Sequence, residues 1–264
     1  MPELAEVEFY RKCWDPGLGQ KIGVVQLHDN KRVFRGEDTK ALCCRLVRQE
    51  YLRSQVHGKQ MLFEFSGDNW LGIHLGMSGK LRVEKQGFEP GKHDHLVLQQ
   101  ASRSLVFCDP RQFGRVRFHH GKKAPAWWPA NLPEVHSRAF TRKLMSAFVK
   151  RHARAPIKAV LLLQGGFPGI GNWMADEILW RAGIAPQRRA AELREAKLIL
   201  LWRNVRFVAR ASLESIGKNN TDPPHDWLLH ERWKSRGKCP KHGTKLRRET
   251  VGGRTTAWCP RCQH

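Results

Sequence analysis

The stretch Gln60–Glu84, QMLFEFSGDNWLGIHLGMSGKLRVE, decides the fold. Short apolar runs alternate in it with Gly, Asp and Asn turns, a pattern typical of short β-strands. Similar runs extend from about residue 20 to residue 119 with no helical pattern between them. Because many strands without intervening helices indicate an antiparallel sandwich or barrel, we predict a β-sandwich here. The expected strands are Lys21–Leu27, Leu46–Val56, Gln60–Phe65, Trp70–Leu75, Lys80–Glu84, His95–Gln99, Ser104–Cys108 and Gly114–His119.

On both sides of this region the apolar residues follow a helical period. Residues 3–12 predict a short helix, and the Pro-rich stretch KKAPAWWPANLP at Lys122–Pro133 predicts a linker. We therefore expect an α+β protein with a sandwich domain at 2–121, a linker at 122–136, a helical domain at 137–233 and a Cys/His module at 234–264. The expected helices of the third part are Phe140–Val149, Pro156–Gln164, Asn172–Ala182 and Ala190–Ser215.

The charge of the chain indicates a polyanionic partner. Lys and Arg number 47 against 24 acidic residues, which gives a net charge of +23. Nucleic acid is the first candidate for such a partner. Neither an export signal nor an apolar run of membrane-spanning length is visible, so we expect a cytoplasmic protein without membrane contact. The cysteines at positions 13, 43, 44 and 108 are then expected to be reduced thiols.

The tail contains two pairs of metal-binding residues. Cys239 and His242 form one pair and Cys259 and Cys262 the other, each with two residues between its members. Three thiolates and an imidazole suit tetrahedral zinc. A module this small cannot build a hydrophobic core of its own and needs a bound metal ion to be stable. We predict one structural zinc ion, with no ligand position left for water. Coincidental cysteines are the weaker alternative. Between the pairs, Arg254 follows two glycines at an expected hairpin tip, where a phosphate or base contact is favoured over a merely solvated charge.

The N-terminus suggests covalent chemistry. Removal of Met1 would leave Pro2 as a secondary α-amine, which is partly unprotonated near neutral pH. Attack of such an amine on a sugar aldehyde gives a cationic iminium that acts as an electron sink. Glu3 and Glu6 have the i, i+3 spacing of one helix face and are expected to face Pro2. Taken alone, Met-Pro-Glu could equally be an ordinary start of a chain.

Three further features suit DNA. The turn Gly165–Asn172 predicts a helix N-terminus with Asn172 as its N-cap and bare amides for a phosphate, although a plain interhelical turn competes with this interpretation. Met77 and Phe113 follow strands, with Arg111 beside the latter; apolar wedges plus Arg can fill the hole left by an everted base. Without that context, Met77 and Phe113 would be core residues and Lys59 one more surface lysine.

Together these residues resemble the Fpg/Nei superfamily, and its formamidopyrimidine-DNA glycosylase (Fpg) branch in particular. The resemblance rests on blocks in the same order along nearly the whole chain. It implies a β-sandwich, a helix-two-turn-helix domain and a zinc finger. The blocks are PELAEVE at Pro2–Glu8, Gly58-Lys59, HLGMSG at His74–Gly79, KHDH at Lys92–His95, DPRQFG at Asp109–Gly114, GIGN at Gly169–Asn172, ADE at Ala175–Glu177 and the terminal run Gly253–Gln263.

The resemblance implies a bifunctional DNA glycosylase and abasic-site lyase of base excision repair that acts on damaged duplex DNA by β,δ-elimination. Pro2 would be the Schiff-base nucleophile, Glu3 the general acid/base, and Glu6 an electrostatic partner of Pro2. Lys59 would donate a proton in β-elimination, and Arg254 would bind phosphate and support δ-elimination. Met77, Arg111 and Phe113 would fill the void. DNA contacts are further implied for His74, His93, Arg111, Lys158 and Asn172.

The chain also departs from the family pattern. His242 replaces a cysteine of the finger, Ala5 a proline, Gln112 a basic residue and Leu163 an aspartate. The segment Ile216–Trp233 is short where Fpg enzymes carry the loop that closes over 8-oxoguanine. This argues against a preference for 8-oxoguanine and leaves ring-opened purines, oxidised pyrimidines and further-oxidised guanines as candidate lesions.

We therefore expect a monomeric, bacterial-type, nucleoid-associated repair enzyme without a nucleotide cofactor. A non-catalytic binder of damaged or distorted DNA is the alternative, although it has no use for an amine beside two carboxylates. A zinc-ribbon accessory protein of transcription or the ribosome would explain the tail but not the N-terminus.

Overall fold

The computed structural model describes residues 1–128 and 132–264. It divides into two compact units, and Glu3–Ala5 belong to the second unit whereas Met1–Pro2 belong to the first. Within the described residues, the first unit continues from residue 6 to 128 and the second comprises 132–264. Residues 129–131 of the predicted linker lie outside the described residues. Among those described, no helix is both long and apolar enough to span a bilayer.

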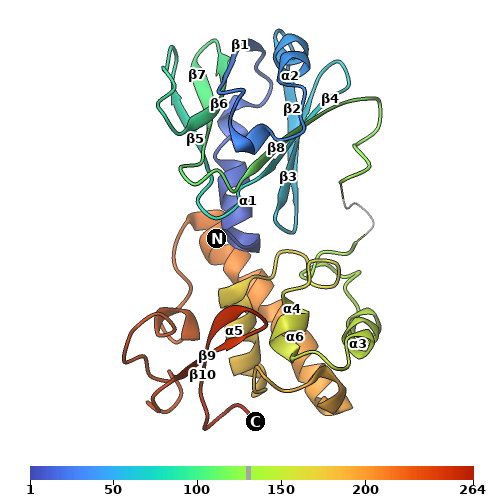
Figure 1. The fold of residues 1–264 in the computed structure, drawn as a ribbon, viewed down its shortest axis with the longest axis vertical. Coiled ribbons are helices and arrows are strands. Elements are labelled where there is room, and N and C mark those ends of the chain that lie inside the picture. Colours follow the sequence, from blue (N-terminus) through green and yellow to red (C-terminus); the bar gives the residue numbers. More distant parts are fainter. Residues whose placement is uncertain (129–131) are drawn as a thin grey trace. The chain divides into compact units, whose positions relative to one another are not determined.

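Two four-stranded antiparallel sheets form the first unit (Figure 1). One has the strand order β1-β6-β7-β5 and the other β2-β3-β4-β8. Their strands closely follow the predicted runs. The bounds are β1 Ile22–Leu27, β2 Tyr51–His57, β3 Gln60–Phe65, β4 Asn69–His74, β5 Lys80–Lys85, β6 Asp94–Gln100, β7 Arg103–Cys108 and β8 Arg115–His120, with short 3-10 turns η1 at Asp15–Gly17 and η2 at Arg32–Phe34.

Side chains of both sheets meet in one hydrophobic core, which makes the pair a sandwich. Phe63 of β3 and Phe107 of β7 come from opposite sheets and belong to the same buried cluster. Trp14 is also fully buried there, with its ring centroid 4.8 Å from that of Phe63. Its Nε1 donates to the carbonyl oxygens of Arg82, at 3.2 Å, and Val106, at 3.4 Å. The indole therefore buries a large apolar surface without leaving its one donor unpaired.

The first unit also contains a helix that the sequence pattern did not reveal. This helix, α2, spans Thr39–Leu46, and Asp38 caps it by accepting from the amide of Ala41 at 2.9 Å. Its apolar face is short, because only Leu42 and Leu46 are buried. The predicted strand Leu46–Val56 is therefore wrong at its start, since β2 begins at Tyr51.

The second unit is helical and carries the C-terminal hairpin (Figure 1). Helix α5 lies at its centre, with nine of its residues buried, and packs against α6 in the main hydrophobic core. The predicted helix Ala190–Ser215 is divided into two elements. Its first residues form the 3-10 turn η3, and the α-helix α6 begins only at Glu195. The helices are α1 Leu4–Lys12, which begins in this unit, α3 Arg142–Arg151, α4 Ile157–Leu161, α5 Asn172–Ala182, η3 Ala190–Glu192, α6 Glu195–Ser212, the π-helical turn η4 Leu213–Gly217 and η5 Leu228–His230.

Strands β9 (Arg247–Val251) and β10 (Arg254–Trp258) form the antiparallel C-terminal hairpin. Its two tip residues, Gly252 and Gly253, have φ of +59° and +73°, a region that favours glycine. The tip lies against α4, because a Cβ on Gly252 would come within 2.7 Å of the Cβ of Ala159. The hairpin confirms the C-terminal element of the expected α+β fold.

Candidate functional site

The Glu3 side chain binds the N-terminus of α5. Its Oε2 accepts from the amides of Gly171 at 3.0 Å and Met174 at 3.1 Å, and its Oε1 accepts from that of Trp173 at 2.9 Å. Glu3 is only 2% exposed, and a helix N-terminus favours such a buried negative charge. These amides were predicted to be bare and ready for a phosphate. That prediction is wrong, because a carboxylate of the same chain already binds them.

Two further expectations for this region need correction. Helix α1 begins at Leu4, so Glu3 lies outside it and does not share a helix face with Glu6. The N-cap of α5 is Gly171, and Asn172 is the first helical residue rather than the cap. The Asn172 side chain instead donates to the carbonyl of Thr255 in β10, at 2.9 Å.

The glycine-rich turn before α5 is shaped for this arrangement. Gly169 has φ +88° and accepts a hydrogen bond from the amide of Leu4 at 3.0 Å. A Cβ on Gly171 would lie 2.2 Å from the Glu3 carboxyl carbon. Gln164 holds the turn from its other side: its Oε1 accepts from the Gly169 amide, and its Nε2 donates to the carbonyl of Ile170. The turn therefore leaves space for one carboxylate beside the helix.

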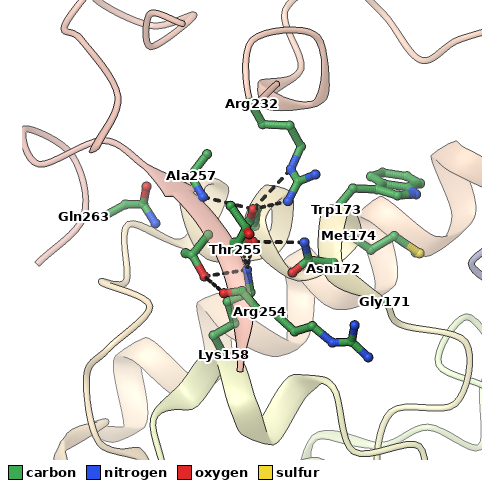
Figure 2. Close-up of polar contacts among 12 residues, drawn as sticks. Lys158, Gly171, Asn172, Trp173, Met174, Arg232, Arg254, Thr255, Ala257 and Gln263 are labelled. Carbon is green, nitrogen blue, oxygen red and sulfur yellow. Dashed lines mark hydrogen bonds and ion pairs between the residues drawn. The ribbon is translucent and has the colours of Figure 1, made fainter. Parts of the chain in front are cut away.

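A buried ionic network connects α4, α5 and β10 (Figure 2). The Lys158 ammonium lies 2.6 Å from Asp176 Oδ1 and donates to Thr256 Oγ1 at 2.7 Å and to the Thr255 carbonyl at 3.2 Å. Both charged side chains are fully buried. A direct contact of Lys158 with DNA was predicted. The structure instead gives Lys158 a structural role, because its ammonium is buried and donates to groups inside the unit.

The second oxygen of Asp176 completes the network. Arg232 donates to Asp176 Oδ2 from Nη2 at 2.6 Å and from Nε at 3.1 Å, and the amide of Ala257 donates to the same oxygen at 3.2 Å (Figure 2). Burial lowers the pKa of Lys158, and the charge of Asp176 opposes that change. The network fixes β10, and with it the exposed Arg254 at the start of that strand.

The neighbouring residue Glu177 is also buried. Its Oε1 accepts from Arg181 Nε at 2.7 Å and its Oε2 from the amide of Leu229 at 3.2 Å. Burial raises the pKa of Glu177 to about 7, although the charge of Arg181 acts in the opposite direction. Glu177 thus links α5 to the turn η5.

In the first unit, one buried carboxylate organises the two loops that carry Met77 and Phe113. Asp109 Oδ1 accepts from Ser78 Oγ at 2.6 Å, and its Oδ2 accepts from the amide of Gly114 at 2.7 Å. The loops approach so closely that a Cβ on Gly76, whose φ is +63°, would lie 2.4 Å from the Phe113 carbonyl carbon. In the sequence, Asp109 belongs to the DPRQFG motif, but no local pattern indicates a role for it.

The proposed wedge residues lie on the surface rather than in the core. Met77 and Phe113 are each 41% exposed, which excludes the core interpretation for both. The guanidinium of Arg111 lies 5.0 Å from the centre of the Phe113 ring, and that of Arg32 lies at 5.8 Å. The exposed phenyl ring thus offers an apolar surface with two guanidinium groups beside it.

Lys59 and His74 lie at neighbouring strand ends, since Gln60 at the start of β3 is paired with His74. Lys59 lies in the β2–β3 turn beside Gly58, whose φ is +60°, and is 9% exposed. His74 ends β4, and its Nδ1 accepts from the amide of Gly76 at 3.1 Å. Burial lowers the pKa of His74, and the charges of Lys59 and other cations lower it further. Pro2, Glu6 and His93 are half-buried.

The four predicted metal ligands come together in the second unit. The ligand atoms of Cys239, His242, Cys259 and Cys262 all lie within 4.8 Å of one another. The Sγ atoms of Cys239 and Cys262 are 3.9 Å apart, close to the separation of about 3.8 Å expected for two thiolates on tetrahedral zinc. Trp180 of α5 donates Nε1 to Cys239 Sγ at 3.3 Å. The donor set can therefore hold a metal ion and fits zinc.

Family models match most of the chain. The formamidopyrimidine-DNA glycosylase N-terminal domain matches residues 1–116, and the formamidopyrimidine-DNA glycosylase H2TH domain matches residues 132–222. Curated relatives include the formamidopyrimidine-DNA glycosylases of Carboxydothermus hydrogenoformans, 32% identical over 272 residues, and of Roseiflexus sp. (strain RS-1), 35% identical over 281 residues. Both alignments cover 100% of this chain and 100% of the relative.

Solved structures with the same fold include DNA complexes. The formamidopyrimidine-DNA glycosylase of Lactococcus lactis bound to abasic-site DNA is 27% identical, with a TM-score of 0.87 and 99% of each chain covered. The same enzyme with DNA containing an oxidised pyrimidine has 28% identity, a TM-score of 0.89 and 99% coverage of each chain.

Proposed function

The chain belongs to the formamidopyrimidine-DNA glycosylase family, and from this membership we propose that it excises damaged bases from duplex DNA and then cleaves the strand at the resulting abasic site. The observation that carries this proposal is the Glu3 carboxylate, which follows Pro2 directly and is bound by three backbone amides of α5. A buried, fixed carboxylate next to a potential secondary amine suits covalent catalysis. A protein that only binds DNA does not need it.

Pro2 acts as the nucleophile in this proposal, once Met1 is removed. Its nitrogen attacks C1′ of the damaged nucleotide, the N-glycosidic bond breaks, and opening of the sugar ring gives an iminium. The iminium acidifies the C2′ hydrogen. Loss of that proton with cleavage of the C3′–O bond is β-elimination, and a second elimination breaks the C5′–O bond.

Glu3, Lys59 and Arg254 supply the other catalytic groups. Glu3 exchanges protons with the sugar as it opens, and amides on both of its oxygens fix its orientation. Lys59 donates a proton during β-elimination and binds a phosphate beside the lesion. Arg254 binds phosphate and supports δ-elimination, and its strand is held by the network around Asp176. Glu6 tunes the charge around Pro2.

The DNA is held by residues of both units. Met77, Arg111 and Phe113 fill the space of the everted base; the exposure of Met77 and Phe113 supports this role. His74, His93 and Asn172 contact the backbone or the opposite strand. Zinc, bound by Cys239, His242, Cys259 and Cys262, shapes the hairpin and takes no part in the reaction. The enzyme works as a monomer, without a nucleotide cofactor, on cytoplasmic DNA.

The lesion class follows from the short segment after α6. Trp227 is 2% exposed and packs with its ring centroid 6.3 Å from that of Trp173. His230 Nε2 lies 2.8 Å from the Pro223 carbonyl oxygen, so the second half of this segment is held by contacts. A segment this short does not supply the loop that closes over 8-oxoguanine in this proposal. We therefore propose ring-opened purines, oxidised pyrimidines or further-oxidised guanines as substrates in preference to 8-oxoguanine.

Borohydride trapping tests the chemistry. Wild-type enzyme with Met1 removed should form a reduced covalent adduct with an abasic-site duplex and should nick it. Pro2→Gly should lose the adduct, because it replaces the secondary amine, whose adduct is a cationic iminium from the start, by a primary amine. A Glu249→Gln variant, altered at an exposed residue of β9, should trap like the wild type. Equal trapping and nicking by Pro2→Gly would refute the Pro2 mechanism, and duplex binding without nicking by the wild type would indicate the non-catalytic binder.

A further inference from the structure

A cavity lies on the outer face of the β2-β3-β4-β8 sheet, and of the residues on its wall only His74 takes part in the function proposed above. Its volume is about 210 Å³, and the groups that matter on its wall are Arg35, Gly72, His74, Arg115, Arg117 and Trp127. It lies wholly in the first unit.

The strand register explains why these side chains share one face. His74 of β4 is paired with Arg115 of β8, and Gly72 is paired with Arg117. Residues two apart in a strand point to the same side, so both rows face outward while Ile73 and Val116 belong to the core. Gly72 provides the floor, because a Cβ there would lie 2.2 Å from Cη2 of Trp127. The indole of Trp127 thus forms a wall over a glycine.

The cavity is strongly cationic. No carboxylate lines it, and among residues 1–128 and 132–264 no ion pair includes Arg35 or Arg117. Arg117 lies over the Trp127 ring at 5.2 Å, and Arg35 Nη1 donates to the Gly114 carbonyl at 2.8 Å. Arg115 has one carboxylate nearby, Glu37 at 3.6 Å, and its buried Nε has no hydrogen-bond partner among the described residues.

These cations act on one another. Burial lowers the pKa of Arg35, and the charges of Arg115, Arg32 and Arg117 lower it further. Burial and the charge of Arg115 likewise lower the pKa of Arg117, and the charge of Glu37 opposes this change. A bound anion would reduce the repulsion between these like charges. Guanidinium groups match the geometry of phosphate oxygens, so phosphate is a suitable anion.

We propose that this cavity binds a phosphate group, with Arg115 and Arg117 as its main ligands and Trp127 against the attached sugar or base. The phosphate could come from the backbone of bound DNA, in which case the inference rests on the proposed function, or from a free nucleotide. The chemistry is the same in both cases. In either case the two main ligands lie on β8, outside the loops that carry Met77 and Phe113, although Arg35 and His74 touch the backbone of those loops.

The test compares two double variants that each remove two positive charges from the first unit. Arg115→Gln/Arg117→Gln alters the cavity, and Lys85→Gln/Arg103→Gln alters the paired residues of β5 and β7 as a control. Calorimetric titration with inorganic phosphate and with 2′-deoxyadenosine 5′-monophosphate measures free ligands. Affinity for an abasic-site duplex at several salt concentrations measures the backbone contact, since each lost phosphate contact reduces the salt slope by about 0.9.

If DNA supplies the phosphate, the cavity variant should lose about one contact from the salt slope and the control should lose less. If a free nucleotide is the ligand, only the cavity variant should lose calorimetric binding, with unchanged duplex affinity. Identical behaviour of the two variants in both assays overturns the proposal. Arg117→Gln alone guards against misfolding, because among the described residues the Arg117 guanidinium forms no ion pair and lies over the Trp127 ring. Nicking at saturating enzyme should persist in all variants; its absence in the wild type would contradict the proposed function instead.

Discussion

The carboxylate of Glu3 accepts a hydrogen bond of 3.0 Å from the backbone amide of Gly171, at a position where the glycine leaves no room for any side chain. The two residues are 168 positions apart in the sequence. The residue next to the proposed nucleophile is therefore oriented by a turn of the helical unit. The geometry of that turn becomes part of the catalytic arrangement.

Gly171→Ala should slow catalysis without straining the backbone at position 171. Gly171 has φ −126°, which alanine adopts freely, so the effect comes from the added Cβ, 2.2 Å from the Glu3 carboxyl carbon. Displacement of that carboxylate should slow single-turnover base excision by roughly 100-fold, as small misplacements of catalytic groups do. Gly165→Ala is the matched control, because nothing lies within 4 Å of its Cβ. Equal excision rates for both variants would show that the position of the Glu3 carboxylate does not affect catalysis.

Asp176→Asn should loosen the C-terminal hairpin. The change leaves Lys158 and Arg232 buried without their shared counter-charge, and removal of one partner of a buried ion pair costs about 3–5 kcal/mol. We expect a lower urea midpoint, faster proteolysis after residue 233 and weaker nicking. Glu214→Gln, which removes the exposed partner of Lys218, should change none of these. A fully stable Asp176→Asn protein would show that the network is not needed to hold β10.

The stability of the protein should depend on Glu177 between about pH 4.5 and pH 7. Its pKa rises from 4.5 to about 7 on folding, so the folded state binds the proton more tightly. The stabilising contribution is complete below about pH 4.5 and is lost as the pH rises through 7, by at most roughly 3 kcal/mol. Urea titrations at several pH values should show this decline in the wild type and not in Glu177→Gln. Parallel pH profiles would contradict the buried-acid assignment.

One zinc ion should be bound per chain, and its removal should unfold the hairpin. Chelation should change the fluorescence of the buried Trp180, whose Nε1 donates to Cys239. Cys259→Ser and His242→Ala should each lower the metal content measured by elemental analysis, whereas Lys241→Ala should not. Full zinc content in His242→Ala would mean that the fourth ligand lies elsewhere.

The parts of the fold that local patterns determine were predictable. Alternating apolar runs located the strands, and the Cys/His spacing located the metal ligands that the structure brings within 4.8 Å. Helix α2 was missed because only two of its residues are buried, which leaves almost no helical period to detect.

The contacts that required tertiary structure were not predictable. Lys158 resembles any basic residue in the sequence, and only the fold buries it against Asp176. The amides of α5 suggested a phosphate site because nothing local indicates that Glu3 fills it. The central role of Asp109 depends on two loops more than 30 positions apart meeting at one carboxylate.

The contact between Gly252 and Ala159 has an evolutionary consequence. The hairpin tip and the first turn of α4 leave no volume between them, because a Cβ at 252 would come within 2.7 Å of the alanine methyl. Neither position can accept a larger residue while the other is unchanged. In an alignment of relatives, the residues at positions 159 and 252 should therefore change together. A larger residue at one position alone is expected only in relatives whose hairpin lies farther from α4.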